Sequence, residues 1–125
     1  MAMTKTAVDL IGTSGAKTNL AGGASSTSSS RNASTLVGIM IQALATYGGS
    51  APTTQPLVEV FTSSDDTNYD TEAYESFYLP TANSTTKQAS IPVRFAEDVK
   101  YYKVKVTNGA ANAADFWVAA VEVAL

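Results

Sequence analysis

Apolar and polar residues alternate most regularly near the C-terminal end of the chain. In the segment 101–107, Tyr102, Val104 and Val106 are separated by Lys103 and Lys105. Successive side chains of a β-strand point to opposite faces, so this spacing predicts a strand with one buried and one solvated face. A second strand is predicted over residues 116–125, after the turn-forming residues 108–112.

Four further strands are predicted upstream. The long apolar run 35–45 has no charged residue, contains Gly38 and precedes a breaker-rich stretch, which favours a strand buried on both faces over a helix. Strands are also predicted over 57–62, 71–79 and 89–95. Pro92 cannot donate to a sheet ladder, so the last of these is expected at an edge or with a kink.

This spacing of short strands and turns predicts the fold class. We expect an all-β protein, an immunoglobulin-like antiparallel β-sandwich of about seven strands, over residues 34–125. Residues 1–33 are rich in Ser, Thr, Ala and Gly, although Val8, Leu10 and Ile11 could support a short strand. We expect this segment to be a flexible or extended N-terminal arm that gains order against a partner.

Composition then narrows the function. The 125 residues include no Cys and no His, which removes thiolate metal sites, disulfides and the commonest general base. We therefore expect no enzyme, no catalytic or metal-binding residues and no cofactor. The net charge of −3 disfavours nucleic acid as a partner, and no apolar stretch has the length of a membrane span or the form of a signal peptide.

An acidic and aromatic loop is the candidate ligand site. Acidic turns more often bind their own backbone, but glycan stacking and a loose calcium site stay open, while Thr71 and Phe77 break the calcium-binding pattern of an EF-hand. Acid–base chemistry by Asp65 and Glu75 is a weaker alternative. The candidate ligand residues are Asp65, Asp66, Tyr69, Asp70 and Tyr74.

Charge is also unevenly distributed along the chain. No basic residue lies between Arg31 and Lys87, whereas over residues 87–105 the five basic residues outnumber the two acids, Glu97 and Asp98. If these segments lie on different faces, neighbouring subunits could meet with complementary potentials. An ordinary solvated surface is the alternative.

Two patterns carry a resemblance to a known family. Asp98, Tyr102 and Val104 have the spacing of the tyrosine corner of immunoglobulin-like domains. The order of strands and turns over 34–125 resembles the small immunoglobulin-like virion proteins of tailed bacteriophages, including capsid decoration proteins and head or tail ornaments. This resemblance implies a non-enzymatic virion subunit, assembled in the host cytoplasm, that binds the major capsid protein or another virion protein and is frequently a trimer.

The last strand supplies the predicted subunit interface. Phe116, Val118 and Ala120 are taken as outer positions, opposite a core-facing set of Trp117, Ala119, Val121 and Val123. The leading hypothesis is a homo-oligomeric capsid decoration or stabilisation subunit that binds the phage shell through residues 1–33. The alternative is a receptor- or glycan-binding adhesion module, on a tail or cell surface, that uses the loop 63–78.

Overall fold

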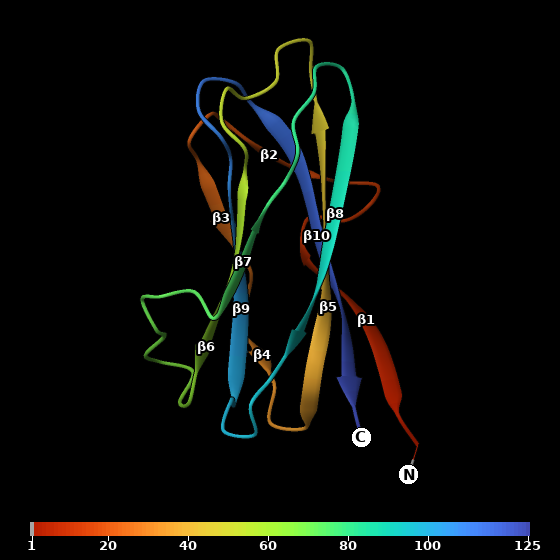
Figure 1. The fold of residues 1–125 in the computed structure, drawn as a ribbon, viewed down its shortest axis with the longest axis vertical. Helices are drawn as coiled ribbons and strands as arrows, with labels where there is room; N and C mark the ends of the chain where they lie inside the picture. Colours follow the sequence, from red (N-terminus) through yellow and green to blue (C-terminus); the bar gives the residue numbers. More distant parts are fainter. Residues whose placement is uncertain (1) are drawn as a thin grey trace.

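The computed structural model describes residues 2–125, and these contain strands but no helix. The strands form two antiparallel sheets that face each other (Figure 1), which confirms the predicted all-β sandwich. No helix long and apolar enough to cross a membrane occurs in this part of the chain. The ten strands are β1 (Thr4–Ile11), β2 (Thr18–Leu20), β3 (Ser25–Thr27), β4 (Arg31–Asn32), β5 (Leu36–Tyr47), β6 (Leu57–Ser63), β7 (Glu75–Tyr78), β8 (Thr86–Arg94), β9 (Tyr101–Thr107) and β10 (Ala114–Ala124).

Each sheet has five strands, and the pairing is nested. The first sheet has the order β1-β10-β5-β8, with β2 also paired to β10; the second has the order β3-β9-β6-β7, with β4 also paired to β9. The first four strands, β1 to β4, therefore pair with the last two, β9 and β10. Among the strands between them in the chain, β5 pairs with β8 and β6 pairs with β7. The two-layer architecture is shared with immunoglobulin-like domains, and the nested order is that of a double Greek key, or jelly roll.

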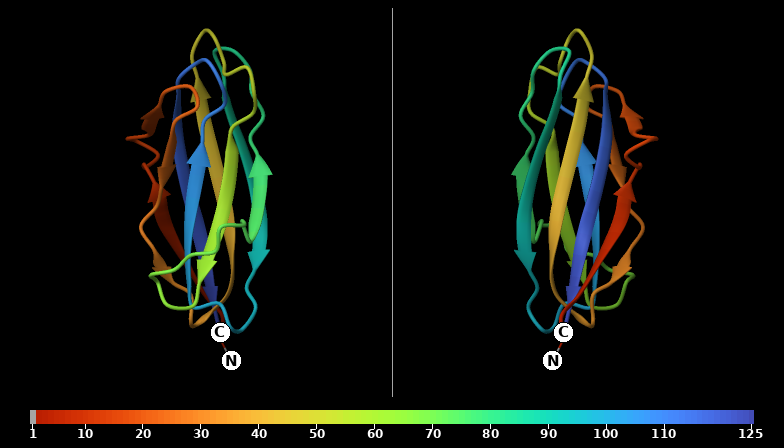
Figure 2. Two further views of the ribbon diagram at one scale, coloured as in Figure 1. Left: turned by 90° about the vertical axis from the view of Figure 1, so that its left-hand side faces the viewer. Right: turned by 90° about the vertical axis from the view of Figure 1, so that its right-hand side faces the viewer.

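The core lies between the two sheets and is built from one face of each long strand. Ile41, Val60, Val104 and Phe116 are completely buried, and each comes from a different strand. Figure 1 views the two layers edge-on, and Figure 2 views each layer face-on with the other layer behind it. Tyr102, Val104 and Val106 face inward as the alternation predicts.

The predicted subunit interface on β10 is wrong, because its two faces are the reverse of those expected. Phe116 and Val118 are fully buried and Ala120 is 2% exposed, so all three belong to the core. Glu122 lies on the same face and is also buried. A carboxylate can occupy the inner face only because Arg31 neutralises it, and the alternation within β10 cannot reveal that partner.

The long strand β5 also differs from the expectation of burial on both faces. Its inner residues are buried, but Met40 on the outer face is 41% exposed. Gly38 has a steric role, since a Cβ there would lie 2.6 Å from the carbonyl oxygen of Val93 on the neighbouring β8. Strand β8, which contains Pro92, lies at the edge of the first sheet as predicted.

The segment 1–33 is not an arm separate from the sandwich in its described part. β1 and β2 pair with β10, whereas β3 and β4 pair with β9, so this segment contributes to both sheets. The buried Asn108 further ties it down by donating its Nδ2 to the carbonyl oxygen of Leu20 at 3.0 Å. Backbone pairing with β9 and β10, which lie near the other end of the chain, orders this segment. Its Ser- and Gly-rich composition could not offset the loss of conformational entropy alone.

Candidate functional site

A partly buried ionic cluster joins the two sheets. Glu122 of β10 accepts two hydrogen bonds from Arg31 of β4, from Nε at 3.0 Å and Nη2 at 2.8 Å. The hydroxyl of Tyr102 on β9 donates a third bond to Glu122 Oε2 at 2.7 Å. The hydroxyl of Tyr102 therefore bonds a side chain rather than the upstream backbone, unlike that of a tyrosine corner.

The electrostatics of this cluster indicate a structural role. Burial is the largest influence on Glu122 and acts to raise its pKa, but the hydrogen bonds from Arg31 and Tyr102 together hold that pKa below its ordinary value. Burial, followed by the hydrogen bond to Glu122, raises the pKa of Tyr102. Glu122 thus stays ionised and Tyr102 protonated, so neither is poised to exchange a proton at neutral pH.

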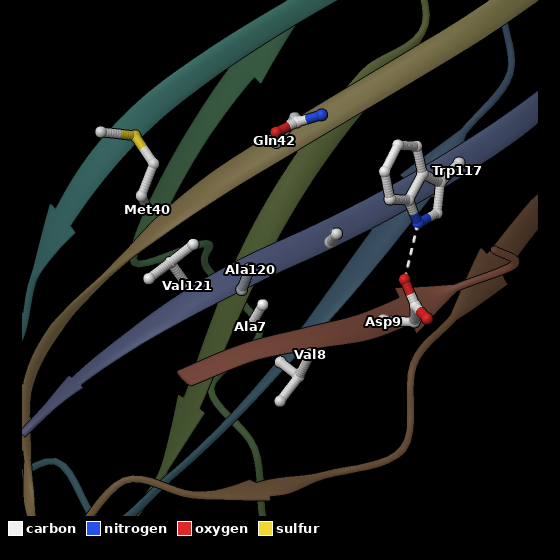
Figure 3. Close-up of a pocket in the computed structure, with 9 residues that line it drawn as sticks. Ala7, Val8, Asp9, Met40, Gln42, Trp117, Ala120 and Val121 are labelled. Carbon is white, nitrogen blue, oxygen red and sulfur yellow. Dashed lines mark hydrogen bonds between the residues drawn. The ribbon is translucent and has the colours of Figure 1, made fainter. Parts of the chain in front are cut away.

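The outer face of the first sheet carries an apolar surface with a shallow hollow of about 230 Å³. Trp117 lies at one end, where its indole Nε1 donates to Asp9 Oδ1 at 2.8 Å. Met40 and Val121 lie at the other end, and Ala7 lies between (Figure 3). We call Ala7, Met40, Trp117, Ala119 and Val121 the apolar face.

A second hollow of about 260 Å³ adjoins the apolar face at Met40 and extends it toward the chain ends. Met3 and Val37, which are 55% and 39% exposed, line it together with Val123. The sequence pattern did not predict this surface. It singled out Trp117, Val121 and Val123 but assigned their side chains to the core. The bulk of Trp117 favours the core, but its indole lies on the outer face and donates to the edge-strand residue Asp9.

The candidate ligand loop is held together by its own side chains. Asp65 Oδ1 accepts from the backbone N–H groups of Thr67 and Asn68 at 2.9 and 2.8 Å, and its Oδ2 accepts from Asn68 Nδ2 at 2.9 Å. The bond from the backbone N–H of Asn68 is the largest of several that lower the pKa of Asp65. Asp65 therefore supports the turn, and its oxygens are largely occupied.

Other members of the loop have their own contacts. Asp66 accepts from the hydroxyl of Tyr69 at 2.7 Å. Tyr74 donates its hydroxyl to the carbonyl oxygen of Arg94 at 2.9 Å and packs on Phe95 with a ring separation of 6.0 Å. Within residues 2–125 no three Asp or Glu side chains converge on a metal-sized space.

Part of the acidic segment and part of the basic segment lie side by side in the second sheet. Strands β6 and β9 are neighbours in the second sheet, and Glu59 pairs with Lys105 across them. Lys103 places its Nζ 4.1 Å from the ring centre of Tyr69. A hollow of about 240 Å³ beside this contact is lined by Thr27, Phe61, Tyr69, Asp70, Lys103 and Lys105.

Comparisons with known proteins identify the fold. No protein-family model matches the sequence, and no curated protein matches it. The chain is similar in structure to VP2 of the infectious bursal disease virus subviral particle, with a TM-score of 0.65, 6% identity and coverage of 98% of this chain and 32% of that one. It is also similar to the PBSX exported protein XepA, with a TM-score of 0.60, 10% identity and coverage of 94% and 36%.

A carbohydrate-binding module shares the fold as well. This module, from Cellvibrio mixtus lichenase 5A and solved with cellotriose, has a TM-score of 0.51, 8% identity and coverage of 97% of this chain and 86% of that one. The chain spans about a third of the length of the VP2 and XepA chains. At these identities the likeness establishes a β-sandwich fold that occurs in viral capsid, phage-derived and carbohydrate-binding proteins.

Proposed function

We propose that this protein is a non-enzymatic structural subunit of a virus particle, which decorates or stabilises the shell by binding the major capsid protein or another virion protein. The observation that carries this proposal is the apolar face, an exposed apolar surface on the outside of a sheet whose other side already covers the core. Exposed apolar surfaces of this kind are typical of protein interfaces.

Two features support a protein partner over a substrate. The hollows on the first sheet are shallow and mainly apolar. Among residues 2–125, Asp9 is the only charged residue that lines the hollow at Trp117, and its carboxylate is already bonded to the indole. A virion role is also in keeping with the occurrence of the fold in VP2 and XepA. Because β1 is paired into the first sheet, we place attachment on this face and not on a free arm.

The test is reconstitution on particles that lack the chain. Purified protein is added to shells of the virus that encodes it, and bound copies are measured by sedimentation and electron microscopy. Met40→Glu should reduce occupancy at least tenfold, because it places a charge where the two apolar hollows meet. Tyr78→Glu is the matched control, since Tyr78 is 60% exposed on the second sheet.

The two variants also provide the contrary result. Wild-type occupancy by Met40→Glu, or an equal loss with Tyr78→Glu, would exclude the apolar face as the attachment surface. Absence of any binding by the wild-type protein to such shells would exclude the decoration role itself.

A second candidate function is adhesion to an acidic glycan, and it rests on the hollow beside Lys103 and Tyr69. Two lysines and two aromatic rings line this hollow, a combination suited to a sugar ring that carries a carboxylate. A glycan array with the wild type and Lys103→Ala/Lys105→Ala distinguishes the roles. Binding of acidic glycans that the double variant loses supports adhesion, and an array without signal opposes it.

A further inference from the structure

One edge of the first sheet is long and open. β1 has eight residues and pairs only with β10 among the strands of residues 2–125. Its first four residues, Thr4 to Ala7, are all exposed. The free edge of such a strand presents backbone N–H and C=O groups that can bind another strand.

The other edge strands are poorer templates. β8 is comparably long but contains Pro92, which lacks the N–H group needed for a continuous ladder. The edge strands β7, β3 and β4 of the second sheet have four, three and two residues. β1 therefore combines length with the absence of proline, and a bulge interrupts it only beyond Asp9.

The charges on β1 are arranged symmetrically about Ala7. Lys5, Ala7 and Asp9 occupy the outer face, since they lie opposite Val123, Val121 and Ala119 of β10. In an antiparallel pair of two β1 strands centred on Ala7, Lys5 of each copy lies directly opposite Asp9 of the partner subunit. The pairing thus forms two cross-strand ion pairs on one face, and the strand is complementary to itself.

We propose that two copies of this chain associate through β1 about a twofold axis at Ala7, which joins their first sheets into one continuous sheet. Asp9 can serve both contacts, because Oδ1 accepts from Trp117 and no described residue donates to Oδ2. Thr6 of one copy then lies opposite Val8 of the other on the inner side. This inference goes beyond the proposed function, and it brings two apolar faces side by side as one larger surface.

The test uses charge exchange between two variants of the full chain. Light scattering after gel filtration should show a concentration-dependent dimer for the wild type. Lys5→Glu and Asp9→Lys each place like charges opposite one another twice, so each should weaken the dimer about tenfold or more. An equimolar mixture of the two variants restores opposite charges at both positions and should form a mixed dimer.

Matched controls separate these positions from a general charge effect. Lys100→Glu and Glu97→Lys make the same changes at exposed sites in the loop before β9, and both should dimerise like the wild type. Because Asp9→Lys also removes the bond to Trp117, circular dichroism should confirm that this variant is folded. If it does not fold, hydrogen exchange of wild-type amides 5–9 replaces it, and protection there should increase with protein concentration.

Several outcomes would overturn the inference. A wild type that stays monomeric at millimolar concentration, or that forms a trimer, contradicts the twofold pairing. So does a dimer that Lys5→Glu leaves unchanged, a mixture of folded variants that stays monomeric, or exchange at 5–9 that does not depend on concentration. Shell attachment is measured separately, so failure here leaves the proposed function standing, and the reverse also holds.

Discussion

The guanidinium group of Arg31 binds the carboxylate of Glu122 through two parallel hydrogen bonds, although 91 residues separate them in the chain. Arg31 belongs to the second sheet and Glu122 to the first, so the pair connects the layers close to where the chain passes from β4 into β5. Tyr102 adds a bond from β9. These bonds hold β4, which lies in a segment of low apolar content, against the core.

Removal of the arginine should weaken the fold. Arg31→Ala leaves Glu122 with Tyr102 as its remaining donor, and we expect a loss of about 2 kcal/mol in the free energy of unfolding, since Arg31 itself is partly exposed. Urea denaturation measures this loss. Arg94→Ala, at an exposed position of β8, should change stability by less than about 0.5 kcal/mol. Equal effects of the two substitutions would show that the ion pair is not structural.

Acid should destabilise the protein partly through Glu122. The pKa of Glu122 is lower in the folded state than its ordinary value of 4.5, so the unfolded chain takes up the proton first as pH falls. The stability that this group provides is therefore present above pH 4.5 and is lost as pH falls through the lowered pKa. Urea midpoints between neutral and acidic pH should follow this course.

The variant Glu122→Gln isolates this contribution. It cannot titrate at position 122, so its stability should fall less steeply with acid than that of the wild type, even though it is less stable at neutral pH. Asp65, whose pKa is also lowered, keeps its share of the acid response in both proteins. Parallel pH profiles would contradict the assignment to Glu122.

The inward position of Phe116 predicts a large effect of truncation. Phe116 is completely buried between the sheets, so Phe116→Ala should cost about 3–5 kcal/mol in the free energy of unfolding through lost apolar burial and a cavity. Met40→Ala, on the opposite side of the same sheet, should cost less than about 1 kcal/mol. Chemical denaturation of both variants compares the two faces. A larger loss with Met40→Ala than with Phe116→Ala would instead support the subunit interface predicted from the sequence.

Gly109 should not accept a side chain. A Cβ at this position would lie 1.7 Å from the backbone carbonyl oxygen of Thr54, so the two loops would have to separate. We expect Gly109→Ala to cost about 1–3 kcal/mol, measured by thermal unfolding. Gly49→Ala is the control, because a Cβ at Gly49 would have no atom within 4 Å apart from those of the adjacent residues. This substitution should leave the melting temperature nearly unchanged. A matching loss at Gly49 would indicate a general backbone effect.

Much of the fold is determined locally and could be predicted. The alternation around Tyr102, Val104 and Val106 specifies a strand and its buried face, because side-chain direction reverses at each residue. Pro92 specifies an edge because it cannot donate to a second neighbour. The candidate ligand loop was likewise recognisable as turn material, and the self-bonding alternative describes Asp65 correctly.

Other features depend on partners distant in the chain. The alternation in β10 divides its residues into two sets, but which set faces the core depends on Arg31 and Tyr102 receiving Glu122 inside and on Asp9 binding Trp117 outside. The order of residues 4–32 similarly requires β9 and β10 as pairing partners. Sequence alone therefore determined the strands from β5 to β10 and their period, because these follow from neighbouring residues. Only the tertiary structure decided the orientation of β10, the place of the apolar face and the open edge at β1, because each depends on contacts between residues far apart in the chain.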